Sequence, residues 1–216
     1  MDSTRQHAIV IGSSMAGLLA ARVLSDHFAK VTVLERDELP EGPENRKGVP
    51  HGRHAHALLA SGYRVIAGLF PPIDAALEAA GAPRGDPGKD AIWFQQGRYK
   101  VTFESGLEVV GMTRPLLERE VRERVRALAN IQLRDGIDVI GPRYDSATMR
   151  VVGVTFCQVG STSEATLDAD LVVDASGRGS QTPKCWSSGA TSGHPRPKSR
   201  LTSVIRPGCL NASLNT

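Results

Sequence analysis

The sequence of 216 residues lacks the features of an exported or membrane-spanning protein. No apolar run reaches the length of a membrane span, and residues 1–7 place no signal-peptide apolar region before the first expected strand. The three cysteines, Cys157, Cys185 and Cys209, are scattered and do not have the spacing of metal ligands. These absences predict a cytoplasmic protein with no metal site.

Basic residues are also too sparse to suggest a nucleic-acid partner. The net charge is +3, and no basic run has the required density. A nucleophile triad is missing as well, because Ser13 and Ser14 do not form a G-x-S-x-G elbow. With 40% apolar and 23% charged residues, the composition is that of an ordinary globular domain. These observations identify no catalytic residue and no oligomeric state.

The sequence does contain a strand, a glycine turn and a helix start in close succession. The apolar run Ala8–Ile11 stops at Gly12, and a helical pattern follows at once. Gly12 and Gly17 occupy the first and third positions of a G-x-G-x-x-G motif, and Ser14 occupies the second. Outward-pointing N–H groups at the positive end of a helix suit a pyrophosphate. The residues expected to bind it are Gly12, Ser13, Ser14, Met15, Ala16 and Gly17.

A second strand, residues 31–35, follows at the right distance and ends in Glu35. This carboxylate is placed to accept hydrogen bonds from a ribose hydroxyl, which favours the unphosphorylated ribose of FAD or NAD over that of NADP. The neighbouring Arg36 weakens that preference. An ordinary βα unit with a glycine turn is the alternative, but the strand context favours an adenine dinucleotide. The predicted fold class is α/β, a Rossmann-like domain built on a parallel sheet.

The rest of the chain predicts further elements of both types. Aromatic and alternating residues from 92 to 110 predict antiparallel strands inserted into the parallel architecture. Trp93, Phe94, Tyr99 and Phe103 are expected in the core. The pairs Glu118/Arg122 and Glu120/Arg124 are expected on the exposed side of a helix. Helices are predicted over 15–28, 52–70, 73–81 and 115–129, a hairpin over 138–144 and 150–158, and a buried parallel strand over 171–175.

Asp174 ends that last strand and is followed by Gly177 and Gly179. Its carboxylate could accept hydrogen bonds from a ribityl hydroxyl or simply cap the next turn. Earlier in the chain, the loop and helix start around residues 51–56 carry His51, Arg53, His54 and His56. Convergence of these imidazoles on a metal is not expected, since no cysteine or carboxylate completes a set. They could equally be surface residues.

Three segments in order resemble one family. Residues 12–24 with 33–37 resemble the start of FAD-dependent oxidoreductases of the aromatic-hydroxylase and squalene-epoxidase type. Residues 48–56 are similar to a segment of a bacterial subgroup that includes polyether epoxidase-like enzymes. Residues 171–180 resemble the family's later D-A-x-G strand end. The resemblance covers residues 8 to about 184.

This resemblance implies an FAD-binding oxidoreductase, either a flavin-dependent monooxygenase or an epoxidase. Such enzymes hydroxylate or epoxidise a small organic substrate through a flavin hydroperoxide, with NAD(P)H as a candidate electron donor. It also implies that Arg53 and His54 face the flavin and that Arg114 lies against the FAD phosphates. Arg114 could otherwise be a solvated residue at a helix start. Asp174 and Gly177 complete the expected cofactor contacts.

The resemblance implies a domain over residues 1–184, with a partial substrate-domain β insertion at about 85–112. Residues 185–216 are unlike it in composition, since no Asp or Glu follows Asp174. We expect an atypical, disordered tail there, translated out of frame or otherwise foreign. The alternatives are a truncated, inactive FAD-binding remnant and an NAD-binding reductase fragment.

Overall fold

The computed structural model describes residues 5–71, 73–182 and 203–205. Its elements fall into two compact units, which are described one at a time. The first contains Met1–Leu39 and Val125–Thr216, and the second contains Pro40–Arg124. The tail expected over 185–216 lies, apart from residues 203–205, outside the described residues.

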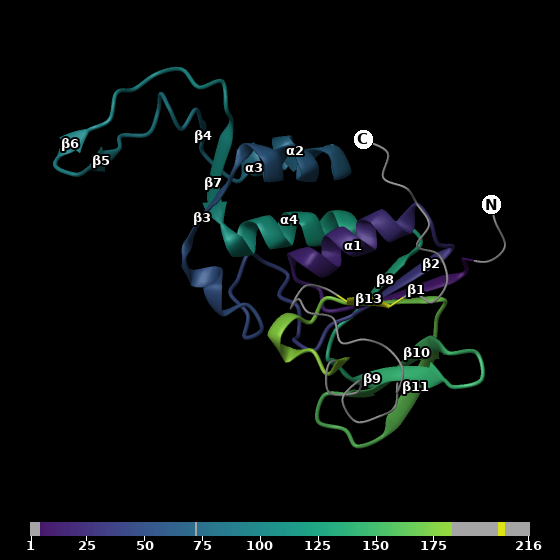
Figure 1. Ribbon diagram of the computed structural model, residues 1–216. Helices are drawn as coiled ribbons and strands as arrows, with labels where there is room; N and C mark the ends of the chain where they lie inside the picture. The colour runs from purple at the N-terminus through teal and green to yellow at the C-terminus, as the bar shows by residue number, and fades with distance from the viewer. Residues whose placement is uncertain (1–4, 72, 183–202, 206–216) are drawn as a thin grey trace. The chain divides into compact units, whose positions relative to one another are not determined.

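A parallel sheet forms the centre of the first unit (Figure 1). Its strands lie in the order β12-β1-β2-β8, and Val10 pairs with Val33 on one side and Val173 on the other. The inner strands are almost wholly buried because both faces of the sheet are covered. The bounds are β1 His7–Ile11, β2 Lys30–Leu34, β8 Ile131–Arg134 and β12 Leu171–Asp174. The predicted fold class is therefore confirmed.

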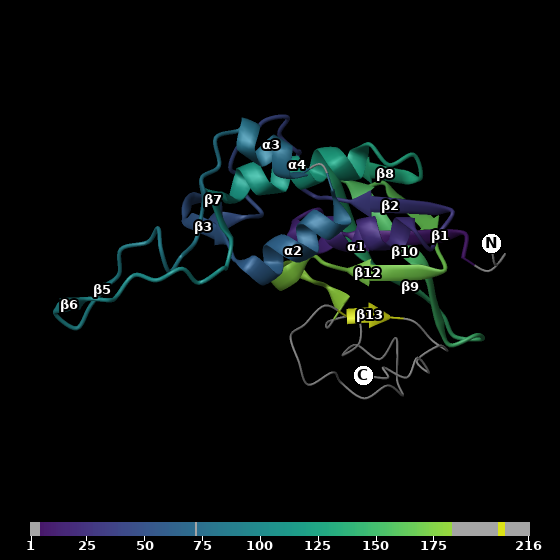
Figure 2. The same ribbon diagram turned by 90° about the horizontal axis from the view of Figure 1, so that it is seen from above.

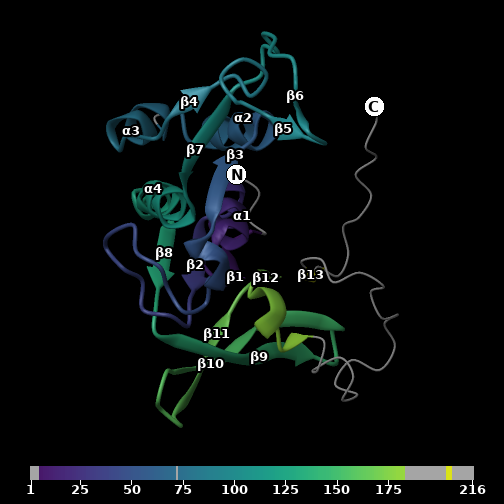
Figure 3. The ribbon, with the colours of Figure 1, turned by 90° about the vertical axis from the view of Figure 1, so that its left-hand side faces the viewer.

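Helix α1 (Met15–Ser25) and the antiparallel sheet β11-β10-β9 cover opposite faces of the parallel sheet (Figures 1 and 3). The antiparallel strands are β9 Ile137–Asp145, β10 Arg150–Gln158 and β11 Glu164–Asp168. The predicted hairpin is thus present. α1 ends before Asp26, three residues earlier than predicted. A short strand, β13 (Ser203–Ile205), pairs antiparallel with β12, so these three residues correct the expectation of a disordered tail.

The core between the two sheets is apolar and draws residues from both. Burial of each such side chain contributes about 1.5–3 kcal/mol to the stability of the fold. The cluster consists of Ile9, Leu34, Ile137, Val151, Val154, Phe156 and Val172.

The second unit corrects the predicted helix over 52–70. Residues 55–58 are instead a strand, because they pair antiparallel with β7, as in His56 with Met112. Helix α2 begins only at Ala60. The elements are η1 Pro50–Arg53, β3 Ala55–Leu58, α2 Ala60–Leu69, α3 Ile73–Ala79, β4 Arg84–Gly85, β5 Phe94–Gln95, β6 Arg98–Tyr99, β7 Val109–Thr113 and α4 Arg114–Arg126.

Helix α4 buries the apolar side chains of Leu117 and Val121, which are inaccessible or nearly so. The prediction of an exposed charged side was wrong, because Glu118, Glu120 and Arg122 are buried too. Arg124 does bond Glu120 at 2.9 Å, but Arg122 donates to the carbonyl of Pro40. Buried charges require hydrogen-bonding or oppositely charged partners. For Arg122 and Glu118, the carbonyl of Pro40 and the side chain of Arg46 provide such partners from outside the helix.

The aromatic segment contains the predicted antiparallel pairing, between β5 and β6, but its side chains do not have the predicted burial. Trp93, Phe94, Tyr99 and Phe103 are exposed rather than in the core. β5 and β6 form a two-stranded ribbon at the far end of a long excursion from β4 and β7 (Figures 1 and 2). Across the part of the chain that the structure describes, no helix combines the length and apolarity needed to cross a bilayer.

Candidate functional site

The turn between β1 and α1 requires glycine at both of its ends. Gly12 has a φ of +93°, and a Cβ there would lie 2.8 Å from the carbonyl oxygen of Ala175. A Cβ at Gly17 would lie 1.8 Å from the carbonyl oxygen of Gly12. The backbone amide of Gly12 donates to the carbonyl of Leu34 at 2.7 Å. Packing, independently of any ligand, therefore explains both glycines.

Serine at the second motif position does not strain this turn. Ser14 precedes α1 with φ −76° and ψ 179°, a conformation open to any residue. Met15 begins the helix and Ala16 is exposed, and the first turn of α1 contains no acidic residue. The positive end of the helix therefore carries no side-chain carboxylate of its own to compete with an anion.

Glu35 lies buried directly after β2, where the sequence places it. Its Oε2 accepts the backbone amide of Ser13 at 2.7 Å and the hydroxyl of Ser13 at 2.8 Å. Its Oε1 accepts the amide of Asp37 at 3.0 Å, while Arg36 is exposed. The carboxylate is thus held beside the glycine turn before any ligand binds.

Asp174 at the end of β12 organises the loop that follows it. Its Oδ1 accepts the amide of Ser176 at 3.0 Å and its hydroxyl at 2.5 Å. Its Oδ2 accepts the hydroxyls of Ser180 and Thr182, each at 2.5 Å. Burial alone would raise the pKa of Asp174, but these hydrogen bonds outweigh it and hold the pKa below its usual value. Capping of the next turn is therefore seen, and the ribityl contact stays a prediction.

Gly177 begins η2 (Gly177–Gly179) with a φ of +66° and is exposed. The two hydroxyls on Asp174 Oδ2, from Ser180 and Thr182, were missed by the sequence analysis. The sequence does contain a signal for these two hydrogen bonds, because Ser180 and Thr182 follow Asp174 within one short loop. Gly12, Glu35 and Asp174 thus meet at the carboxyl ends of neighbouring strands, the usual ligand edge of such sheets.

The second unit contains a separate charged cluster at the start of α4. Glu118 accepts from Arg46 Nε at 2.7 Å through Oε1, and its Oε2 lies 3.6 Å from Arg114 Nε. Arg46 and Glu118 are almost wholly buried, and the Arg114 side chain is 17% exposed. A small pocket lies here, lined by Glu44, Asn45, Arg46, Val49, Gly52, Arg114, Pro115 and Glu118. Arg46 was missed by the sequence analysis because its partner lies 72 residues away.

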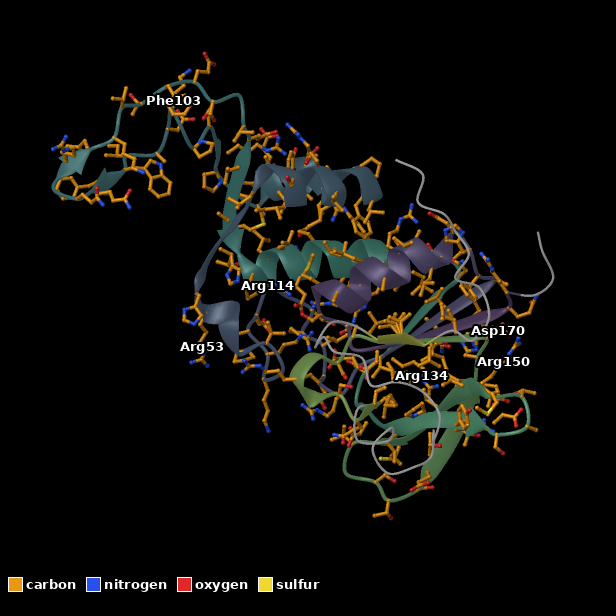
Figure 4. The ribbon with its side chains drawn as sticks, viewed as in Figure 1. Arg53, Phe103, Arg114, Arg134, Arg150 and Asp170 are labelled. Carbon is orange, nitrogen blue, oxygen red and sulfur yellow. The ribbon has the colours of Figure 1, made fainter. Side chains whose placement is uncertain are left out.

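Arg53 ends η1 and is exposed (Figure 4). His54 is exposed as well. His56 forms a 2.7 Å hydrogen bond between its Nδ1 and the carbonyl of His54. Gly52 packs closely, since a Cβ there would lie 2.6 Å from Asn45 Oδ1. In the described residues, no three His, Cys, Asp or Glu side chains gather as they would around a metal ion.

Known proteins resemble this chain in sequence and in fold. No family model matches it. The Mycobacterium tuberculosis protein Rv3254 is 42% identical over 191 residues, which are 85% of this chain and 40% of that protein. The myxobacterial FAD-dependent chondrochloren halogenase CndH has a TM-score of 0.60 at 20% identity, over 83% of this chain and 39% of that one.

The flavin-dependent monooxygenase PieE, whose structure contains FAD and substrate, has a TM-score of 0.55 at 19% identity. The match covers 78% of this chain and 29% of PieE. At such identities the likeness shows a shared fold. The chain spans less than half the length of each of these proteins.

Proposed function

We propose that this chain binds FAD and forms the dinucleotide-binding part of a flavin-dependent oxidoreductase of the monooxygenase type. The observation that carries the proposal is the glycine turn with Glu35 held beside it at the end of the neighbouring strand. The fold shared with FAD-dependent enzymes supports FAD over other dinucleotides.

The turn suits a pyrophosphate because it leads directly into the N-terminus of a helix. Gly12 and Gly17, where a Cβ would have no room, allow the chain to make this tight turn. Helix α1 begins immediately after Ser14, and its N–H groups suit a phosphate. When bound here, FAD would supply redox chemistry, and the chain would bind and orient it.

Glu35 would accept the hydroxyls of the adenosine ribose. It already accepts three hydrogen bonds, two of them from Ser13, so its position costs no reorganisation on binding. A ribose 2′-phosphate would meet this carboxylate and be repelled, although Arg36 is exposed next to it. The proposal therefore favours FAD or NAD over NADP at this turn.

The proposal extends to further contacts with the cofactor. Asp174 and Gly177 would meet the ribityl side of FAD, Arg53 and His54 would face the flavin, and Arg114 would meet a phosphate. Arg114 is near Glu118, so a phosphate would share it with that carboxylate. The reaction proposed is hydroxylation or epoxidation of a small organic molecule, with NAD(P)H as electron donor.

Titration of the purified chain with FAD tests the proposal. We expect flavin fluorescence to be quenched on binding, with NAD⁺ weaker and NADP⁺ weaker still. Glu35→Gln should lower FAD affinity at least about tenfold, which corresponds to roughly 1.4 kcal/mol. The exposed Glu38 provides the matched control, Glu38→Gln, which should bind as the wild type does.

Two results would contradict this proposal. Absence of FAD binding by folded chain would favour the inactive remnant, and tighter binding of NAD⁺ than of FAD would favour a reductase fragment. If the chain bound FAD but showed no NAD(P)H-dependent oxygen consumption, the assignment of FAD would stand and the proposed activity of this chain would be rejected.

A further inference from the structure

The turn between β9 and β10 contains a methionine in a backbone conformation that few residues with side chains adopt (Figure 1). Met149 has a φ of +55°, in the left-handed region that glycine and asparagine usually occupy. Such a conformation persists where neighbouring contacts fix it, and it often marks a functional position. Met149 is also 47% exposed, so solvent reaches its side chain.

Hydrogen bonds to Asp145 shape this turn. The carboxylate of Asp145 accepts the amide of Ala147 at 3.0 Å and the hydroxyl of Thr148 at 2.5 Å. These bonds close the turn at the two residues that precede Met149. The backbone that leads into Met149 is therefore fixed without any contribution from the methionine side chain.

The side chain of Met149 is held separately, by Tyr144. The phenolic hydroxyl of Tyr144 donates to Met149 Sδ, with the oxygen and sulfur atoms 3.0 Å apart. Tyr144 packs against the apolar core cluster of the first unit, and it pairs with Val151 of β10. The hydrogen-bond donor is thus positioned by the fold, and it fixes the orientation of the sulfur.

This hydrogen bond makes the two lone pairs of the sulfur unequal. Addition of oxygen to one lone pair or to the other gives one of two epimers of methionine sulfoxide. Tyr144 engages one lone pair of Met149 Sδ. An oxidant that approaches from solvent therefore meets the other lone pair, and the geometry favours a single epimer.

We propose that Met149 is a modification site, at which a hydroperoxide forms methionine sulfoxide of one predominant configuration. The sulfur lone pair that Tyr144 does not engage attacks one oxygen of hydrogen peroxide. A sulfur–oxygen bond forms and the oxygen–oxygen bond breaks, so sulfur loses two electrons and the peroxide gains them. The displaced hydroxide then takes the proton of the transferred hydroxyl and leaves as water. This inference does not depend on flavin binding.

The position of Met149 suits a reversible modification better than those of the other described methionines. Met15 begins α1 and Met112 lies within β7, and both are partly buried. Oxidation makes a methionine side chain polar, which disrupts packed surroundings. At the exposed turn the new oxygen faces water, and methionine sulfoxide reductases can restore the thioether there.

Treatment of the folded 216-residue chain with hydrogen peroxide tests the site. The protein is oxidised without FAD and then digested, and mass spectrometry measures each methionine. This makes failure here distinct from failure of the proposed function. We expect Met149 to oxidise several-fold faster than Met15 and Met112. Oxidation of Met149 no faster than that of the other two would overturn the proposal.

The configuration of the sulfoxide tests the role of Tyr144. The digested peptides are incubated with one or the other of the two methionine sulfoxide reductases, each of which reduces one epimer. In the wild type, one enzyme should reduce nearly all of the Met149 sulfoxide and the other should leave it nearly unchanged. Tyr144→Phe removes the hydroxyl and should give both epimers. Tyr99→Phe, which removes an exposed phenolic hydroxyl from the second unit, is the matched control and should behave as the wild type does.

Oxidation of the wild type in denaturant gives the reference for the folded geometry. The unfolded chain lacks the fixed contact with Tyr144, so it should give both epimers at Met149. The same epimer ratio in the folded and the unfolded wild type would overturn the proposal. An unchanged ratio in folded Tyr144→Phe would overturn it as well.

Discussion

Ser13 donates both its backbone amide and its hydroxyl to one oxygen of Glu35, at 2.7 and 2.8 Å. The first residue after the glycine thus holds the acidic residue that ends the neighbouring strand. Glu35 consequently has a structural role in the ligand-free protein as well as the proposed role toward ribose. Substitutions at Ser13 and at Glu35 can separate the structural role of Glu35 from its proposed role in binding ribose.

Ser13→Ala should weaken FAD binding about fivefold, because a typical hydrogen bond contributes about 1 kcal/mol and Glu35 would lose one that fixes its position. FAD titration measures the effect, and thermal unfolding without FAD measures the structural share. The exposed Ser146 provides the control, Ser146→Ala, which should change neither. Unchanged FAD affinity in Ser13→Ala would show that the hydroxyl does not position Glu35 for the ligand.

Asp174→Asn should lower the free energy of unfolding by about 1–3 kcal/mol at neutral pH, since four hydrogen bonds to a charged acceptor are weakened. The pKa of Asp174 is lowered in the folded chain, so its contribution is complete above the unfolded value of about 3.9 and is lost as pH falls through the folded pKa. Urea unfolding should therefore show the wild type and the variant converging in acid. The exposed Asp138 gives the control Asp138→Asn. A difference that persists in acid would contradict the prediction.

Glu118→Gln should destabilise the second unit by about 3–5 kcal/mol. The substitution removes the buried negative charge that faces Arg46 and Arg114, leaving two guanidinium groups without it. Chemical denaturation measures the loss. Glu123 on the same helix is exposed, and Glu123→Gln should stay within about 0.5 kcal/mol of the wild type. Equal effects of the two substitutions would show that the cluster contributes little.

Asp86 should hold the base of the ribbon excursion down to strongly acidic pH. The hydroxyl of Ser105, followed by the amides of Gly88, Gly106 and Ser105, lowers the pKa of Asp86 to about 2. Because the folded pKa is lowered, these bonds persist as pH falls past the ordinary carboxyl value and are lost only near pH 2.

Hydrogen exchange at Ser105 and Gly106 measures this. Protection should change little between about pH 7 and pH 4 after correction for intrinsic rates, and Asp86→Asn should remove it at pH 7. The exposed Glu104 gives the control Glu104→Gln. Loss of protection near pH 4 in the wild type would contradict the assigned role.

Local sequence pattern was sufficient to predict most of the first unit, although not β13. The β-branched runs, the glycine turn and the hairpin each contain their own signal, and the parallel pairing of β1 with β2 follows from the short βαβ connection. Glu35 and Asp174 were placed correctly at strand ends for the same reason.

The second unit depends on contacts between residues far apart in sequence, and its predictions were weaker. Residues 55–58 form a strand because β7 pairs with them, and no local pattern shows this. Glu118 is buried because Arg46, 72 residues away, neutralises it. The aromatic ribbon alternates as a half-buried strand does, although nothing in the described chain covers it.

The packing of Gly12 and Gly17 affects which positions are informative when distant relatives of this chain are compared. A Cβ at either position would collide with backbone, so a descendant that had lost its ligand would still retain both glycines in order to fold. The glycine pair is therefore a marker of ancestry and folding. Replacement of Ser13 or Glu35 would lose hydrogen bonds but cause no collision with backbone, so these two positions can diverge more readily once selection for the ligand ends. A survey for loss of function should examine those two positions first.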